Sequence, residues 1–361
     1  MRQERVLAGA CPAVLVAVLL APITVAQAAG KPRIAILATG GTIAGAGPSR
    51  VSGKYEAARK PVDELIAAVP EIAKIADVFG EQVAQVGSQA MTDAIWLALV
   101  RRVGALLARK DVHGVVITHG TDTLEETAYF LHLAAQRKGK PVVLVGAQRA
   151  PTALSPDGPM NLYNAVAVAA ADHADRADRG VLVVMNDRIH GARGVTKAHT
   201  TNVDAFVSPD AGPVGEVLGG EVRFHGTPSQ RDGASGALRP GQRKALPRVE
   251  IVYGHANHQP LFVDAAVKAG ARGIVLAGVG NGNPSPVTEK ALIAARKKGV
   301  VVVRASRCGA GRVTRNAEVD DDRHGFVVAG TLNPQKARVL LMLALTRSSD
   351  SKAIQEIFDE Y

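Results

Sequence analysis

The sequence contains very little cysteine and few aromatic residues. Two of its 361 residues are cysteines, and Phe, Trp and Tyr together make up 4%. Cys11 lies in a segment that we expect to be removed, which leaves Cys308 without an intramolecular partner. The fold must therefore be held by an aliphatic core, and Cys308 is interpreted as a small, buried and inert residue.

Several catalytic and cofactor-binding patterns are also missing. Without an H-E-x-x-H or a paired cysteine motif, we expect neither a metal nor a cofactor. No G-x-S-x-G is present, which excludes the usual elbow of a serine hydrolase. Ser349 and Lys352 have the spacing of an acyl-enzyme pair, but they lie in the polar C-terminal tail and are interpreted as chance.

The excess of positive charge is not concentrated in any motif. The formal net charge is +10, from 43 Lys and Arg against 33 Asp and Glu, and acidic residues separate the basic ones. The sequence has no stripe of interleaved aromatic and basic residues. We therefore predict a solvated basic surface and no nucleic-acid partner.

The first thirty residues form a separate segment. Two arginines precede the uncharged stretch Val6–Ala26, which ends in the small-x-small pattern Ala26-Gln27-Ala28. This order predicts a signal peptide over residues 1–28, a periplasmic or secreted protein, and no membrane association after cleavage. An uncleaved membrane anchor is the alternative, since about 20 apolar residues can span a bilayer. Two prolines and the cleavage pattern argue against it.

After residue 28, short apolar runs alternate with helical patterns. Apolar runs bounded by Gly, Pro or polar residues predict strands buried on both faces. These runs are Ile34–Ala38, Gln82–Val86, Val115–Thr118, Val142–Val145 and Val181–Met185. Apolar spacings of three and four predict the helices Pro61–Ala68, Asp93–Ala108, Leu124–Gln136 and Pro159–Ala171. The alternation predicts an α/β fold, in which helices cover both faces of a parallel sheet.

A change of composition predicts a second domain. Residues 226–247 are rich in Gly, Pro, Ser and charge, as expected of an exposed linker. A smaller α/β unit follows, so we place an N-terminal domain at 29–225, the linker at 226–247 and a C-terminal domain at 248–361. The elements expected in this second domain are the strands Val249–Val252, Gly273–Leu276 and Val300–Val303 and the helices Phe262–Ala269, Val287–Lys298, Pro334–Thr346 and Lys352–Phe358.

Polar side chains follow the first three apolar runs, in the segments Thr39–Gly45, Gly87–Gln89 and His119–Glu126. Because ligands bind beyond the carboxyl ends of parallel strands, these groups should meet at one edge of the sheet. The glycine-rich first segment would also suit a phosphate, but neither G-x-G-x-x-G nor G-x-x-x-x-G-K-[ST] is found there. The Thr121-Asp122 pair favours catalysis, whereas His119 is interpreted as structural.

Two of these segments resemble known signature motifs. ATGGTIAG (38–45) and ITHGTDTLEETAYF (117–130) are similar to those of the bacterial type II (periplasmic) L-asparaginases. Further similar segments are GEQVAQVGSQ (80–89), DGPMNLYNAV (157–166), GVLVVMND (180–187), VTK (195–197), AGVGNGN (277–283), AEVDD (317–321) and GTLNPQKARVLL (330–341). The resemblance covers essentially the whole chain after the signal segment. It implies an amidohydrolase that converts L-asparagine to L-aspartate and ammonia.

The resemblance also implies roles for individual residues. Thr42 matches the nucleophile, Tyr55 matches a tyrosine that closes over the site, and Glu318 matches a glutamate that pairs with this tyrosine from a neighbouring subunit. The second catalytic group is matched by Thr121, Asp122 and Lys197. The expected substrate-binding residues are Gly41, Ser88, Gln89, Thr121, Asp122 and Asn283. A homotetramer built from dimers with shared active sites is implied as well.

The chemistry expected of these residues is acyl transfer. A threonine hydroxyl is a weak nucleophile at neutral pH and needs a base. Lys197, whose pKa we expect its neighbours to lower, and Tyr55 are the expected proton acceptors. Attack of Thr42 on the side-chain amide forms a β-aspartyl ester and releases ammonia, and water then frees aspartate. Backbone N–H groups around Gly41 and Thr121 are expected to stabilise the oxyanion.

Two other functions stay open on the sequence. A glutaminase-asparaginase of the same fold often carries Glu in place of Gln89 and Ser in place of Asn283, so the residues found here favour asparagine. A periplasmic solute-binding protein also has two α/β domains with a ligand between them. That alternative does not explain two threonine segments together with Lys197.

Overall fold

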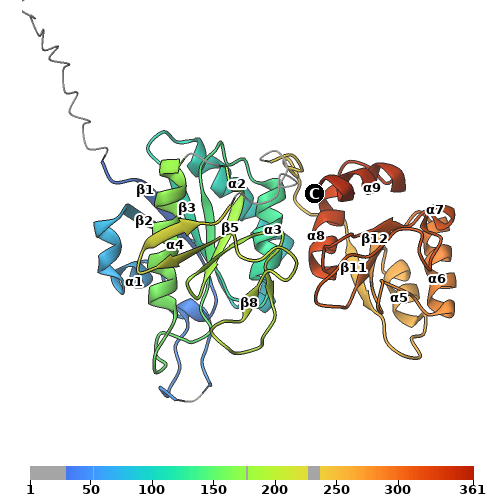
Figure 1. Ribbon diagram of the computed structural model, residues 1–361, viewed down its shortest axis with the longest axis horizontal. Coiled ribbons are helices and arrows are strands. Elements are labelled where there is room, and N and C mark those ends of the chain that lie inside the picture. The colour runs from blue at the N-terminus through green and yellow to red at the C-terminus, as the bar shows by residue number, and fades with distance from the viewer. Residues whose placement is uncertain (1–29, 52, 176–177, 227–235) are drawn as a thin grey trace, which may run out of the picture. The chain divides into compact units, whose positions relative to one another are not determined.

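The computed structural model describes residues 30–51, 53–175, 178–226 and 236–361 (Figure 1). The predicted signal peptide, residues 1–28, lies outside the described residues. Residues 227–235 of the predicted linker also lie outside them. Within the described ranges, no helix is both long and apolar enough to cross a membrane.

The larger sheet has eight strands in the order β10-β9-β6-β5-β4-β3-β1-β2. Strands β1 to β5 run parallel to one another, whereas the pairs β5–β6, β6–β9 and β9–β10 are antiparallel. The bounds are β1 (Arg33–Gly40), β2 (Asp77–Val86), β3 (Gly114–Thr118), β4 (Val142–Val145), β5 (Val181–Met185), β6 (Arg188–Gly191), β9 (Gly215–Leu218) and β10 (Glu221–Phe224). The five predicted strands are therefore present and parallel, as expected.

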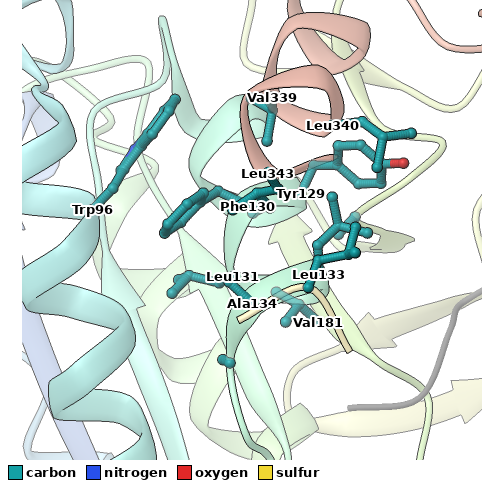
Figure 2. Close-up of a cluster of buried hydrophobic side chains, with 14 of the residues drawn as sticks. Trp96, Tyr129, Phe130, Leu131, Leu133, Ala134, Val181, Val339, Leu340 and Leu343 are labelled. Atoms are coloured by element: carbon teal, nitrogen blue, oxygen red, sulfur yellow. The ribbon is translucent and has the colours of Figure 1, made fainter. Parts of the chain in front are cut away.

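Helices cover both faces of this sheet, as predicted. Side chains alternate between the faces of a strand, so Ala35 and Leu37 of β1 pack in one cluster with α2 and α3, while Ile34 and Ile36 pack in another with α1 and α4. The helix bounds are α1 (Val62–Ala67), α2 (Asp93–Ala108), α3 (Leu124–Ala134) and α4 (Gly158–Asp175). Figure 2 shows part of the first cluster, where Trp96 of α2 lies beside Phe130 of α3.

One feature of the predicted strands is wrong. Strands β3, β4 and β5 are buried on both faces, but β2 contains only partly buried and exposed residues. The reason is its position, because β2 has a strand neighbour on one side only. An apolar run such as Gln82–Val86 does not by itself distinguish the edge of a sheet from its interior.

The smaller sheet is entirely parallel, with the order β11-β12-β13-β14. Helices α5 and α6 share one apolar cluster with this sheet, whereas α8 contacts its other strand residues and also α3. The bounds are β11 (Val249–Tyr253), α5 (Leu261–Lys268), β12 (Gly273–Gly278), α6 (Pro286–Lys297), β13 (Val301–Ser306), α7 (Asp321–His324), β14 (Val327–Val328), α8 (Pro334–Ala344) and α9 (Ser351–Glu360). The predicted smaller α/β unit is confirmed.

Two details depart from the sequence expectation. Cys308 is exposed rather than buried, because the chain turns out of the sheet just after β13. A two-stranded sheet, made of β7 (Thr196–Lys197) and β8 (Phe206–Val207), was not predicted. Such short strands leave no periodic pattern in the sequence, yet β7 carries Lys197.

Candidate active site

The chain changes direction across the larger sheet between β1 and β3. Strand β1 lies between β2 and β3, so the connections after β1 and after β3 leave on opposite sides, and a crevice forms at their carboxyl ends. The two loops meet through glycines. A Cβ atom on Gly41 would lie 2.3 Å from the backbone nitrogen of Gly120, and Gly41 has a φ of +83°. Only glycine allows this close approach.

The first hydroxyl group at the crevice belongs to Thr42. It begins a single 3-10 turn, η1 (Thr42–Ala44), directly after the glycine pair, and its side chain is buried. Its Oγ1 lies 2.7 Å from the hydroxyl oxygen of Tyr55, which is 40% exposed. Backbone hydrogen bonds between Ala46 and Glu56 hold the segment that carries Tyr55 against the start of the same loop. The structure therefore brings Thr42 and Tyr55 together, as expected.

The second group combines a threonine, an aspartate and a lysine. The ammonium group of Lys197 donates to Thr121 Oγ1 over 2.9 Å and to Asp122 Oδ1 over 2.7 Å. Thr121 is buried, Lys197 is mostly covered, and the side chain of Asp122 is 60% exposed. Charge-assisted donation of this kind fixes the position of the ammonium nitrogen relative to both oxygens. These three residues come from β7 and from the loop after β3, and the structure brings them together as the family resemblance implies.

Ser88 supports the second group through hydrogen bonds to the loop after β3. It begins the turn η3 (Ser88–Ala90) after β2, and its Oγ accepts a hydrogen bond from the Asp122 N–H over 3.1 Å. Its carbonyl oxygen accepts from the hydroxyl of Thr123 over 2.8 Å. The neighbouring Gln89 is exposed, and its amide group lies close to Gly87. The loops after β1, β2 and β3 thus converge, although Ser88 and Gln89 do not line the cavity described next.

The two groups open into one cavity of about 630 Å³. Its lining includes Thr42, Tyr55, Thr121, Asp122 and Lys197. Basic side chains also line it, namely Arg50, Lys54 and Arg149. A cavity with this excess of positive charge favours a substrate that carries a carboxylate.

One lining segment was not predicted from the sequence. Residues 148–155 follow β4 and form another part of the cavity wall. Thr152 Oγ1 accepts a hydrogen bond from the Gly47 N–H over 2.8 Å, and the Leu154 N–H donates to the Arg50 carbonyl over 2.7 Å. The rule that placed the other three loops at the carboxyl ends of parallel strands also applies to β4 and would have found this segment.

Two expected residues do not reach this cavity in their own chain. Asn283 and Glu318 lie in the second domain and are absent from the cavity lining. Glu318 is exposed and makes no hydrogen bond or ion pair with any described residue, and the side-chain oxygen of Asn283 is buried without a hydrogen-bond partner there. The role predicted for Glu318 requires a second copy of the chain, and the roles of both residues stay predictions.

Two further observations bear on the chemistry of the site. Among the described residues, no group of three His, Cys, Asp or Glu side chains is arranged to hold a metal ion. His119, next to the second group, is fully buried, and burial lowers its pKa to about 4 even though its hydrogen bond to the Gly120 carbonyl acts in the opposite direction. The imidazole is therefore neutral at neutral pH.

Comparison with known families agrees with the arrangement of the two sheets. Residues 33–230 match the family described as "Asparaginase, N-terminal", and residues 248–358 match "Glutaminase/Asparaginase C-terminal domain". The chain belongs to the asparaginase family. The loops that carry Thr42 and Thr121 thus belong to a member of a family whose named relatives are amidohydrolases.

Several asparaginase relatives are similar over nearly their whole length. The probable periplasmic L-asparaginase of Haemophilus influenzae is 49% identical over 339 residues, which is 94% of this chain and 96% of the relative. L-asparaginase 2 of Escherichia coli is 50% identical, with 91% and 93% covered. A glutaminase-asparaginase of Pseudomonas fluorescens biotype A is 47% identical, with 91% and 90% covered.

A solved asparaginase structure has the same fold. The probable cytoplasmic L-asparaginase of Campylobacter jejuni matches with a TM-score of 0.86 and 47% identity, covering 92% of this chain and 100% of that one. One relative is thus named periplasmic and this structural neighbour is named cytoplasmic, so the names of relatives do not fix the compartment.

Proposed function

We propose that the protein is an L-asparaginase that hydrolyses L-asparagine to L-aspartate and ammonia through an ester on Thr42. The observation that carries this proposal is the pairing of two buried threonines across one cavity. Thr42 contacts the hydroxyl of Tyr55, and Thr121 contacts the ammonium group of Lys197. A solute-binding protein has no need for two hydroxyl groups, each with its own proton-transferring partner.

The proposed reaction has two acyl-transfer steps. Thr42 Oγ1 attacks the side-chain amide carbon as its proton passes to Tyr55, which releases its own proton to Glu318 of a neighbouring subunit. The proton removed from Thr42 is then returned to the amide nitrogen, which leaves as ammonia, and a β-aspartyl ester remains. Water then attacks the ester carbon next to Thr121 and loses a proton to Lys197, which is a neutral amine at this step, and Thr42 Oγ1 regains a proton as aspartate leaves.

We also propose how the substrate is held. Ser88, Gln89, Asp122 and Asn283 are assigned to the α-carboxylate and α-amino group, and the backbone N–H groups around Gly41 and Thr121 to the oxyanion. The Thr121 N–H supports this assignment, because no residue in the described part of the chain accepts a hydrogen bond from it. Removing one oxyanion donor typically costs about 3–4 kcal/mol of transition-state stabilisation.

The proposed preference is for asparagine over glutamine. Gln89 and Asn283 favour it, whereas the Pseudomonas relative is named for both activities. We expect a higher kcat/KM for asparagine, measured as ammonia release from the purified chain without its signal segment. Comparable values for the two substrates would instead support a glutaminase-asparaginase.

The proposed assembly is a homotetramer of dimers with shared active sites, located in the periplasm or secreted. The exposed, unpaired Glu318 and the unpartnered oxygen of Asn283 support an exchange of residues between subunits. The proposed boundaries stay at 29–225 for the N-terminal domain, 226–247 for the linker and 248–361 for the C-terminal domain. Light scattering combined with activity assays tests the assembly, because an active monomer would contradict it.

The decisive experiment compares the wild-type chain with Thr42→Ala. We expect the wild type to release ammonia from asparagine and the variant to bind asparagine without releasing ammonia. Binding of asparagine by the wild type without ammonia release would favour the solute-binding alternative. Full activity of Thr42→Ala would leave the enzyme assignment intact but remove Thr42 as the nucleophile.

A further inference from the structure

A continuous chain of buried hydrogen bonds leads from helix α2 to the loop after β3. The indole nitrogen of Trp96 donates to Thr127 Oγ1 over 2.8 Å, and Thr127 Oγ1 lies 2.9 Å from His119 Nε2. The other ring nitrogen of His119, Nδ1, lies 2.7 Å from the carbonyl oxygen of Gly120. None of the three side chains is more than 4% exposed, so water does not compete for these bonds.

The direction of donation along this chain is fixed at both ends. An indole N–H only donates and a carbonyl oxygen only accepts. His119 Nδ1 must therefore carry a proton and donate to Gly120, while Nε2 accepts from the hydroxyl of Thr127. This arrangement requires a neutral imidazole, which the burial of His119 favours. Bonds aligned in one direction also polarise one another.

The last acceptor belongs to the peptide unit that joins Gly120 to Thr121. A peptide unit is planar, so holding its carbonyl oxygen also fixes the direction of its N–H, which belongs to Thr121. That N–H donates to no residue among those described, and Thr121 lines the same cavity as Thr42. The space around Gly120 is tight, since a Cβ atom there would lie 2.7 Å from Ser88 Oγ.

We propose that His119 is a positioning residue for the oxyanion site, which aims and polarises the Thr121 N–H by holding the Gly120 carbonyl. This inference rests on the proposed function, because only acyl transfer forms an oxyanion at this place. Thr127 and Trp96 act further away: their hydrogen bonds hold the imidazole in one tautomer and one orientation. The ring itself never contacts the substrate or exchanges a proton with it.

Replacing His119 by either of two amide side chains distinguishes the positioning role from a role in packing. The amide nitrogen of asparagine lies close to the position of Nδ1, so His119→Asn retains a donor for the Gly120 carbonyl. The amide of glutamine lies close to the position of Nε2, so His119→Gln retains the contact with Thr127 and loses the one with Gly120. Both variants replace an imidazole by a smaller polar group, which makes each the matched control of the other.

We expect kcat for asparagine to be roughly 3- to 10-fold lower in His119→Gln than in His119→Asn, the effect of one neutral hydrogen bond. KM should stay within about twofold in both, because an oxyanion donor acts in the transition state and not on the bound substrate. A role in packing alone changes the thermal midpoints of both variants but does not separate their kcat values.

A second pair tests the same chain without altering His119. Thr127→Ser retains the hydroxyl and should retain kcat, whereas Thr127→Val leaves Nε2 without a donor and should lower kcat at constant KM. Phe130→Leu is the stability control, because Phe130 stacks on Trp96 with 5.1 Å between ring centres but takes no part in the chain (Figure 2). It should lower the thermal midpoint and leave kcat unchanged.

The outcomes distinguish the positioning role from the proposed function. Ordered kcat values in both pairs, with KM constant, support the role of His119. Equal kcat values for His119→Asn and His119→Gln would overturn that role while the asparaginase assignment stands. A wild-type chain that releases no ammonia would overturn the proposed function and the positioning role together.

Discussion

At the scale of single residues, the site depends on two threonine hydroxyl groups, each of which makes a short contact with a partner side chain. Thr42 and Tyr55 are 2.7 Å apart, and no described residue other than Tyr55 forms a hydrogen bond with Thr42 Oγ1. The contact with Tyr55 therefore orients the Thr42 hydroxyl in the resting state, before any proton is transferred. What a substitution does at this position depends on whether it removes the hydroxyl or only the methyl group.

We expect Thr42→Ala to lower kcat by at least about 1000-fold, as removal of a nucleophile does in other acyl-transfer enzymes. Thr42→Ser keeps the hydroxyl and should stay active, which makes it the matched control. Tyr55→Phe keeps the ring and loses the 2.7 Å contact, so its kcat should lie between the two. Steady-state ammonia release measures all three, and an inactive Thr42→Ser would argue for a role of the methyl group.

A second residue-scale prediction concerns Glu126 of α3. Burial raises its pKa from 4.5 to about 7, while Arg338, 3.9 Å away, acts in the opposite direction and Glu125 adds to the rise. The folded state therefore keeps a proton that the unfolded chain loses between about pH 4.5 and 7, so stability falls as pH rises through this window. Glu126→Gln should raise the thermal midpoint at pH 8.

The same substitution should change little at pH 4, where the wild-type carboxyl is protonated in both states. Thermal unfolding of wild type and Glu126→Gln at the two pH values gives the comparison. Glu356→Gln, at an exposed position of helix α9, serves as the control for the loss of one carboxylate from the surface. A Glu126→Gln midpoint at or below the wild-type value at pH 8 would contradict the buried-carboxyl explanation.

At the scale of elements, the crevice exists because two loops can touch. Gly41 combines a φ of +83° with a backbone neighbour 2.3 Å from where its Cβ would lie, so a side chain requires both strain and movement of the Gly120 backbone. Strain of this kind and overpacking each cost about 1–3 kcal/mol. The loops after β1 and β3 can thus lie this close together because Gly41 has no side chain.

We expect Gly41→Ala to destabilise the fold by about 2 kcal/mol or more and to reduce activity strongly. Gly104→Ala is the opposite control, because a Cβ at this position of α2 meets no atom within 4 Å and helix interiors favour alanine over glycine by about 0.5–1 kcal/mol. Denaturant unfolding should show the first variant less stable than wild type and the second more stable. A neutral Gly41→Ala would mean that the loops separate easily.

The elements also show which parts of the fold could be predicted from the sequence. Apart from the two-residue strand β14, the parallel strands and the helices that cover them were predicted, because their apolar runs and their spacings of three and four extend over enough residues to form a pattern. Strands β6 to β10 were missed because they are two to four residues long and pair antiparallel beyond the regular part of the sheet. The edge position of β2 follows from strand order, which no local pattern encodes.

The candidate site was predictable to the extent that it follows strand ends. Thr42, Thr121 and Asp122 lie directly after β1 and β3, and their neighbourhood follows from the parallel sheet. Lys197 is separated from Asp122 by three further strands and two helices, so only family resemblance indicated it. The hydrogen-bond chain through His119 stayed hidden because Trp96 and Thr127 look like ordinary core residues on two helices.

At the scale of the molecule, the second domain supports the first through Lys336 of α8. This fully buried side chain donates to the carbonyl oxygens of Arg193 and Val195, just before the strand that carries Lys197. Burial lowers its pKa from 10.5 to about 8, although Glu125 acts against the shift and Arg193 with it. An element of the C-terminal domain thus fixes the backbone next to the second catalytic group.

We expect Lys336→Met to lower kcat several-fold, because the two backbone carbonyl oxygens before Lys197 lose their hydrogen-bond donor. The fold keeps a side chain of similar length at this position. Between about pH 8 and 10.5 the unfolded wild-type chain holds more protons at Lys336 than the folded one, so stability rises with pH there, and Lys336→Met should lose this rise. Lys290→Met, at an exposed position of α6, is the control. Unchanged activity of Lys336→Met would limit the residue to packing.

The exposure of Cys308 has a practical consequence for studying the assembly of subunits. Once the predicted signal segment is removed, the sequence leaves one thiol per chain, and it lies on the surface just after β13. A maleimide dye would therefore label every subunit once, without any engineered cysteine. Mixing subunits labelled with donor and acceptor dyes would then report assembly and subunit exchange by energy transfer, directly on the unmodified sequence.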